Sequence, residues 1–152
     1  MLAFVAGAVQ PQGITMQGDA QTSNLGTSTT LGSANIRLKL AQGPELKLQC
    51  GILGVQQVTP VTPTAASTTL QFLHTVTCDD RSIFILNSTT VISATGACTA
   101  PAMGIVGTFH ETSDLTGVAG PYVKRTGHVT IDGTISCGFN KMTIAGTIDP
   151  AP

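Results

Sequence analysis

GHVTIDGTISCGFNKMTIAGTID, residues 127–149, is the stretch that indicates the fold class most directly. Two β-branched runs, 128–131 and 134–137, flank the dipeptide Asp132-Gly133. Asp-Gly between such runs suits a type I′ turn, because both central residues of that turn need positive φ. The stretch therefore predicts a β-hairpin centred on Asp132-Gly133.

The segment 142–148 continues this pattern with a strict alternation of side chains. Met142, Ile144 and Ile148 share one face, and Thr143 and Thr147 share the other. Threonine fits the pleat through its branched Cβ and keeps the outer face wet without carrying charge. We expect the same threonine-faced meander to describe the rest of the chain.

Charge is sparse along the whole chain. Only 10% of the 152 residues are charged, compared with about 25% in a typical domain, and the formal net charge is −1. Such a chain lacks the electrostatic footprint of a protein that binds nucleic acid or an anionic membrane. We therefore expect no nucleic-acid partner, no membrane insertion and weak repulsion between copies of the chain.

Alternating apolar residues mark further strands upstream. The runs 36–40 and 46–50 form a predicted hairpin with a five-residue loop, and 103–111 reads as another strand. In the run 69–77, one face carries Leu70, Phe72, His74 and Val76. With about eight or nine strands and no helical periodicity, the sequence predicts an all-β fold, for which we prefer an antiparallel, jelly-roll-like β-sandwich.

The N-terminal region differs in composition. Residues 10–34 are rich in Gly, Ser, Thr, Gln and Asn, which predicts an extended arm or a long loop. The apolar start of the chain, with Leu2, Phe4, Val5 and Val9, suggests a strand lodged either in its own sheet or in that of a neighbouring copy. We therefore divide the chain into an arm over 1–35 and a single β-sandwich domain over 36–152.

Four cysteines, together with low charge and threonine-rich strands, are typical of secreted or surface-displayed proteins. No pair has the close spacing of a zinc site, so disulfides are favoured over free thiols. A predicted hairpin centred on Ser88 would place Cys78 opposite Cys98 and leave Cys50 to pair with Cys137. A turn at Asp79-Asp80 would break that register.

Chemistry-bearing groups are few. The spacing of His110, Glu111 and Asp114 would let a carboxylate and an imidazole meet around one loop, but no metal-binding or catalytic motif includes them. Asp79 and Asp80 are adjacent, and turn-forming carboxylates are a plainer interpretation than a weak calcium site. His74 falls on the expected inner face, where a hydrogen-bonded buried histidine is commoner than a ligand. The sequence thus predicts no catalytic residue, no metal and no cofactor.

Three functions are compatible with these features. The first is a structural subunit of an extracellular or surface assembly, such as a filament, appendage, coat or capsid-associated layer, whose copies join by strand addition through the N-terminal arm. The second is a monomeric secreted module for adhesion or for binding a carbohydrate or other ligand. The third is a small secreted β-barrel enzyme. We prefer the first, with copies of the chain as partners.

Overall fold

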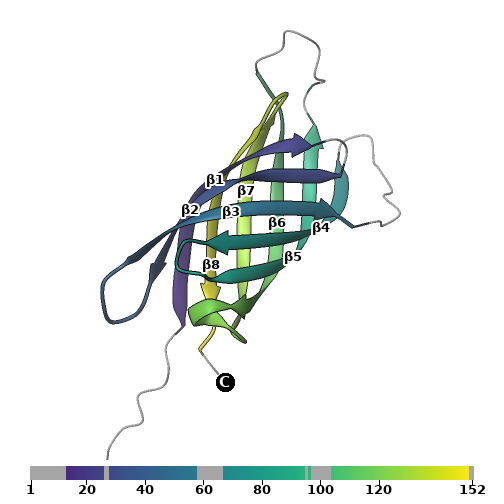
Figure 1. Cartoon of the computed structure of the whole chain (residues 1–152). Helices are drawn as coiled ribbons and strands as arrows, with labels where there is room; N and C mark the ends of the chain where they lie inside the picture. The colour runs from purple at the N-terminus through teal and green to yellow at the C-terminus, as the bar shows by residue number, and fades with distance from the viewer. Residues whose placement is uncertain (1–12, 26–27, 58–66, 95, 97–103, 151–152) are drawn as a thin grey trace, which may run out of the picture.

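Eight antiparallel strands form a closed barrel in the computed structural model, which describes residues 13–25, 28–57, 67–94, 96 and 104–150. Each strand pairs with the next along the chain, and β1 pairs with β8 to close the sheet (Figure 1). The elements are β1 (Ile14–Leu25), β2 (Thr29–Lys39), β3 (Leu46–Gln56), β4 (Thr68–Cys78), β5 (Ile83–Ala94), β6 (Ile105–Ala119), the 3-10 helix η1 (Gly120–Tyr122), β7 (Thr126–Ser136) and β8 (Asn140–Ile148).

The all-β antiparallel class is confirmed, but the sheet closes into a barrel and not a jelly-roll-like sandwich. A sandwich and a barrel share the same alternation of inward and outward residues, so this pattern does not distinguish them. The pairing of the first strand with the last shows that the sheet is a barrel. Figure 1 shows purple β1 beside yellow β8, and their register runs from Ile14 opposite Ile148 to Thr22 opposite Asn140.

The predicted arm is wrong for 14–25 and 29–34, which lie in β1 and β2. In β1, the alternate residues Ile14, Met16, Ala20 and Thr22 point inward and are buried, whereas Gln17 is exposed. Inward and outward side chains alternate in β1 as they do in the other strands. Because several of the inward side chains are small or polar, the sequence does not show this alternation clearly. The boundary at residue 35 therefore falls inside a strand. Residues 1–12, including Leu2, Phe4, Val5 and Val9, lie outside the described part of the chain.

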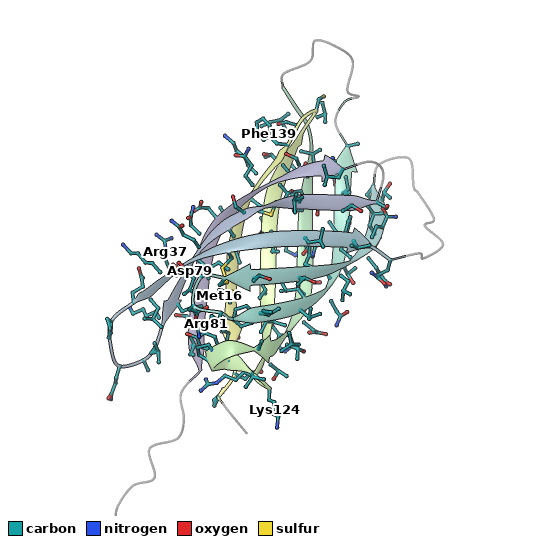
Figure 2. All side chains as sticks on the ribbon, viewed as in Figure 1. Met16, Arg37, Asp79, Arg81, Lys124 and Phe139 are labelled. Carbon is teal, nitrogen blue, oxygen red and sulfur yellow. A yellow bond between two sulfur atoms is a disulfide. The ribbon has the colours of Figure 1, made fainter. Side chains whose placement is uncertain are left out.

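One end of the barrel is closed by close packing. Leu38 and Ile148 are fully buried there, and η1 places Tyr122 against Phe84 with ring centroids 5.7 Å apart. η1 begins at Gly120, whose φ of +77° lies in the left-handed region that glycine adopts without strain. Figure 2 shows Arg81 and Lys124 near this end and Phe139 at the opposite end.

Two predicted turns are strand interiors. Asp132 and Gly133 lie within β7, paired with Thr143 and Met142 of β8, so the hairpin turn falls after Ser136 instead. A Cβ on Gly133 would lie 2.4 Å from ring carbons of Phe109, which shows that this glycine makes room for an inward aromatic ring. Glycine at a close approach and glycine in a turn look alike in a sequence.

Ser88, the predicted centre of another hairpin, lies inside the continuous strand β5. The chain turns earlier, between β4 and β5, where the Asp80 side chain accepts a hydrogen bond from the backbone N–H of Ser82 at 2.9 Å. Arg81 adopts a φ of +70° in the same turn. The interpretation of Asp80 as a turn-forming carboxylate is therefore confirmed.

The predicted disulfide pairing is wrong because it depended on that hairpin. Cys50 of β3 and Cys78 of β4 lie opposite each other in register and form a disulfide, with their Cα atoms 4.0 Å apart. Cys137 is also disulfide-bonded, and Cys98 lies outside the described residues. Cys50 and Cys78 are thus unavailable for the predicted pairs with Cys137 and Cys98.

We expect non-reducing peptide mapping to recover Cys50 joined to Cys78, and the double variant Cys50→Ala/Cys78→Ala to unfold more easily in urea. The disulfide closes a loop between residues separated by 28 positions. Its removal should lower the free energy of unfolding by about 2–4 kcal/mol, because the unfolded chain regains freedom. Recovery of a peptide joining Cys78 to Cys98 would contradict the register of β3 and β4.

A second stability test concerns Gly133. In Gly133→Ala the new methyl group would overlap the Phe109 ring and approach the Lys141 carbonyl oxygen, 2.6 Å from the ideal Cβ position. Urea denaturation should show a loss of about 1–3 kcal/mol, as for other overpacked interiors. Gly51→Ala is the matched control, because a Cβ there meets nothing within 4 Å. Equal losses in the two variants would mean that Phe109 does not pack over Gly133.

Candidate functional site

The barrel interior holds a cavity of about 220 Å³. Side chains at the η1 end, such as Phe84 and Leu115, are almost fully buried, whereas inward residues toward the other end, such as Leu70 and Phe72, are partly exposed. Rim residues of the partly exposed end, including Ser28 and Gln56, also line the cavity. The cavity therefore lies toward this end of the barrel.

Most of the cavity wall is aliphatic or aromatic. β7 and β8 contribute an apolar wall of Val129, Ile131, Ile135, Met142 and Ile144. Among the described residues that line the cavity, none is Lys or Arg, and Glu111 is the one carboxylate. An interior of this kind favours apolar molecules with few polar groups.

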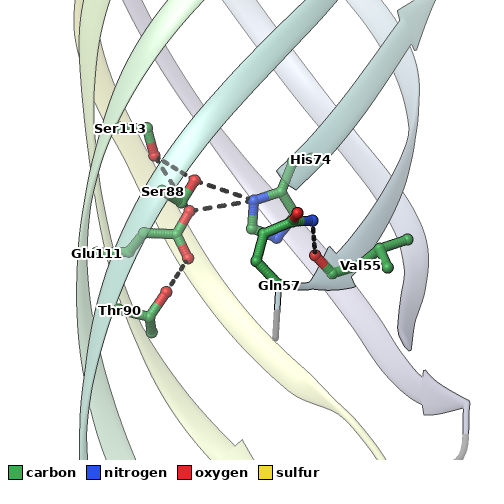
Figure 3. A network of polar contacts seen from close by, with 7 residues as sticks. All are labelled: Val55, Gln57, His74, Ser88, Thr90, Glu111 and Ser113. Atoms are coloured by element: carbon green, nitrogen blue, oxygen red, sulfur yellow. Dashed lines mark hydrogen bonds and ion pairs between the residues drawn. The ribbon is translucent and has the colours of Figure 1, made fainter. Parts of the chain in front are cut away.

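Five polar side chains from β4, β5 and β6 form a buried network beside the cavity (Figure 3). The Glu111 carboxylate accepts hydrogen bonds from Thr90 Oγ1 at 2.7 Å and from Ser113 Oγ at 3.2 Å. Ser88 Oγ lies 2.8 Å from Ser113 Oγ, and His74 Nδ1 lies 3.1 Å from Ser88 Oγ and 3.4 Å from Glu111 Oε1. A buried carboxylate needs several donors to offset its lost hydration, and this network supplies them.

The strand period places these groups inside. Residues 74, 88, 90, 111 and 113 all occupy inward positions, and register sets Ser88 opposite Ser113 and Thr90 opposite Glu111 on β5 and β6. His74 reaches the network from β4, whose residue 74 pairs with Leu86. The three strands thus bring together five residues that are as much as 39 positions apart.

The order of hydrogen bonds determines which histidine nitrogen carries the proton. A carboxylate only accepts, so the Thr90 and Ser113 hydroxyls both donate to Glu111. Ser113 Oγ must then accept from Ser88, and Ser88 Oγ must accept from His74 Nδ1. In neutral His74 the proton therefore lies on Nδ1, and Nε2 carries a lone pair.

Burial lowers the pKa of His74, and the nearby Glu111 carboxylate opposes this shift in part. The His74 side chain is only 13% exposed, so its charged form loses most of its hydration. His74 is thus a largely buried, hydrogen-bonded histidine on the inner face of β4, the face that the sequence predicted.

The network does not have the geometry of a nucleophilic triad. In a Ser-His-acid triad the serine and the acid contact different nitrogens of the imidazole ring. Here Ser88 and Glu111 both contact Nδ1 of His74. The arrangement therefore holds the Glu111 carboxylate and orients the His74 ring, with Nε2 as the nitrogen left for a further contact.

A second polar group lines the cavity from β8, β1 and β2. Asn140 is buried, and its side-chain N–H group donates to Asn24 Oδ1 at 3.1 Å and to Thr22 Oγ1 at 3.3 Å. Asn140 Oδ1 and Thr30 Oγ1 are buried and have no hydrogen-bond partner among the described residues. Both residues line the cavity. A hydroxyl and an amide oxygen in this position can each form a hydrogen bond with water or with a bound molecule.

The residues His110, Glu111 and Asp114 do not gather around one loop as the sequence suggested. All three lie on β6, where Glu111 points inward while His110 and Asp114 point outward. On the outer face, His110 pairs with Asp132 at 2.6 Å and His128 pairs with Asp114 at 2.8 Å. Within the described part of the chain, no cluster of three or more His, Cys, Asp or Glu residues could hold a metal ion.

Sequence reasoning missed Ser88, Thr90, Ser113, Thr30 and Asn140 as site residues. Ser88, Thr90, Ser113 and Thr30 sit in threonine- or serine-rich runs that look like a turn or an outer face, and Asn140 closely follows a glycine that looks like a turn. The available signal was the phase of the alternation: counted in twos from buried Phe84, residues 88 and 90 fall inside.

The fold and the site define a class of protein: an up-and-down β-barrel of eight strands with an internal cavity that is apolar and carries a buried polar network. Comparisons with protein-family models, curated proteins and solved structures find no match. No helix in the described ranges has the length and hydropathy needed to cross a bilayer.

The lowered pKa of His74 predicts that acid destabilises the barrel. As the pH falls below about 6.5, the unfolded chain binds a proton at residue 74 before the folded chain does. The free energy of unfolding is therefore highest above about pH 6.5 and falls as the pH drops toward the lower pKa of His74 in the folded chain. The slope is up to about 1.4 kcal/mol per pH unit.

Urea denaturation between pH 7.5 and 4.5 checks this sign when wild type is compared with His74→Gln. The stability difference between the two proteins should change in favour of the variant as the pH falls. A wild type that gains stability relative to the variant on acidification would mean that Glu111 dominates and raises the pKa of His74.

Proposed function

We propose that this protein binds a small, mainly apolar molecule inside its barrel. The observation that carries the proposal is the cavity of about 220 Å³ beside unpartnered polar atoms of Thr30 and Asn140. Eight-stranded barrels have an interior wide enough for side chains or for one small ligand. An engineered apolar cavity of about 150 Å³ accommodates benzene, so a molecule of one or two rings fits the volume here.

The proposal develops the second function considered above, a secreted binding module, with the ligand inside the barrel. A disulfide between Cys50 and Cys78 is consistent with an oxidising compartment. We therefore propose a secreted or surface-associated binding protein. The polar network supports binding without catalysis, because Ser88 and Glu111 both contact Nδ1 of His74 and so do not form a nucleophilic triad.

Self-association by strand addition stays a prediction with less physical support than before. Strand addition needs an unpaired edge, and every described strand of the closed barrel pairs on both sides. Residues 1–10, the proposed donor, lie outside the described part of the chain. Exposed apolar side chains on the outside of β2 and β3, namely Leu31, Leu53 and Val55, would be the surface available for contact between copies.

Cavity binding can be tested with naphthalene as the probe. Because the chain has no Trp, naphthalene fluorescence can be read without interference from indole. Wild type should bind the probe with a stoichiometry of one. Ile131→Phe, which replaces a branched wall residue by a longer planar ring that competes with the probe for space, should weaken naphthalene binding.

Thr112→Phe is the matched control, since Thr112 is exposed on the outer face of β6. This variant should bind naphthalene as wild type does. Absence of binding by wild type, or equal binding by wild type and Ile131→Phe, would exclude the interior as the binding site.

A further inference from the structure

The polar atoms of the cavity are arranged in a row across neighbouring strands. On β1, β2, β3 and β4, Asn24 pairs with Thr30, Thr30 pairs with Gly54, and Gly54 pairs with His74. Asn140 extends the row from β8 through its hydrogen bond to Asn24. The row therefore has one position without a side chain, at Gly54, between Thr30 and His74.

Gly54 allows Thr30 and His74 to approach each other. An ideal Cβ at Gly54 would lie 2.4 Å from Thr30 Oγ1 and 2.6 Å from His74 Nε2, so these two atoms are at most about 5 Å apart. One oxygen atom can bridge such a span with two hydrogen bonds of about 2.8 Å. Thr30 and His74 both line the cavity, but Thr30 Oγ1 itself exposes almost no surface, so the Thr30 hydroxyl must turn toward the cavity to meet a ligand atom.

The polarity of the two atoms selects the bridging group. His74 Nε2 carries a lone pair, because the network requires the proton on Nδ1. The bridging group must therefore donate to Nε2, and it can accept from the Thr30 hydroxyl, which has no partner among the described residues. A hydroxyl group does both.

The same polarity disfavours an anion. A carboxylate has no proton to donate to His74 Nε2, and neither Lys nor Arg lines the described cavity to neutralise its charge. The unpartnered Oδ1 of Asn140 is another acceptor and also prefers a donor. Burying an unpaired carboxylate here would cost far more than burying a neutral alcohol.

Building on the proposed function, we infer that the ligand is a neutral, mainly apolar alcohol or phenol of one or two rings whose hydroxyl bridges Thr30 Oγ1 and His74 Nε2. The ring system lies against the apolar wall of β7 and β8. The polar network with Glu111 positions His74 by keeping its proton on Nδ1.

Three probes of equal ring size test this inference on the full chain: 2-naphthol, naphthalene and 2-naphthoate. Isothermal titration calorimetry at pH 7.5 should show that 2-naphthol binds about three- to tenfold more tightly than naphthalene, the range that a net hydrogen bond confers. The anion 2-naphthoate should bind more weakly than both.

Variants at Thr30 separate the hydrogen bond from the packing. Thr30→Val keeps the shape and removes the hydroxyl, so it should weaken 2-naphthol binding about three- to tenfold more than it changes naphthalene binding. Thr30→Ser restores a hydroxyl and should retain most of the affinity for 2-naphthol. Thr112→Val, on the outer face of β6, should affect neither probe.

The outcomes distinguish this inference from the proposed function. Equal affinities for 2-naphthol and naphthalene, or an equal effect of Thr30→Val on both, would overturn the hydroxyl site and leave cavity binding intact. Preference for 2-naphthoate would overturn the choice of a neutral ligand. Failure of all three probes to bind would overturn the proposed function as well.

Discussion

The pairing of β1 with β8 is the constraint on which the rest of the structure depends. It joins Ile14 to Ile148 and Thr22 to Asn140 in register, so that strands from the two ends of the described chain become neighbours. With this seam closed, every described strand is paired on both sides and the sheet has no free edge. Closure also converts the two faces of the sheet into an inside and an outside.

The seam also builds part of the candidate site. Asn140 bonds to Thr22 and Asn24 across it, which connects residues 118 and 116 positions apart. These bonds use the amide N–H group of Asn140 and leave its oxygen in the interior, where no described residue is a hydrogen-bond partner for it. The barrel closure and the polarity of the cavity are thus two consequences of one strand pairing.

The interior combines two environments that oppose each other. Aliphatic side chains of β7 and β8 make it a poor solvent for charge, yet Glu111 lies in it with its carboxylate buried. Thr90 and Ser113 resolve this conflict by donating hydrogen bonds to the carboxylate, and His74 Nδ1 lies 3.4 Å from it. Because each hydroxyl has one proton, the network also determines which nitrogen of His74 faces a ligand.

Sequence reasoning succeeded for features that depend on one strand or on one turn between neighbouring strands. It identified the all-β class, the inner face that holds His74, the hairpin that joins β2 to β3, and the turn-forming role of Asp80. It failed where one residue type serves two purposes. Gly133 marks the approach of Phe109 and not a turn, and Ser88 belongs to an internal network and not to a hairpin loop.

The sequence by itself determined the period of two, and with it which residues share a face, because successive side chains on a strand alternate whatever the strand pairs with. Tertiary structure alone decided that the sheet closes, that Cys50 meets Cys78, and that His74 meets Glu111. These facts depend on register between strands. Register depends on the turns and on packing between neighbouring strands, so the alternation within one strand does not specify it.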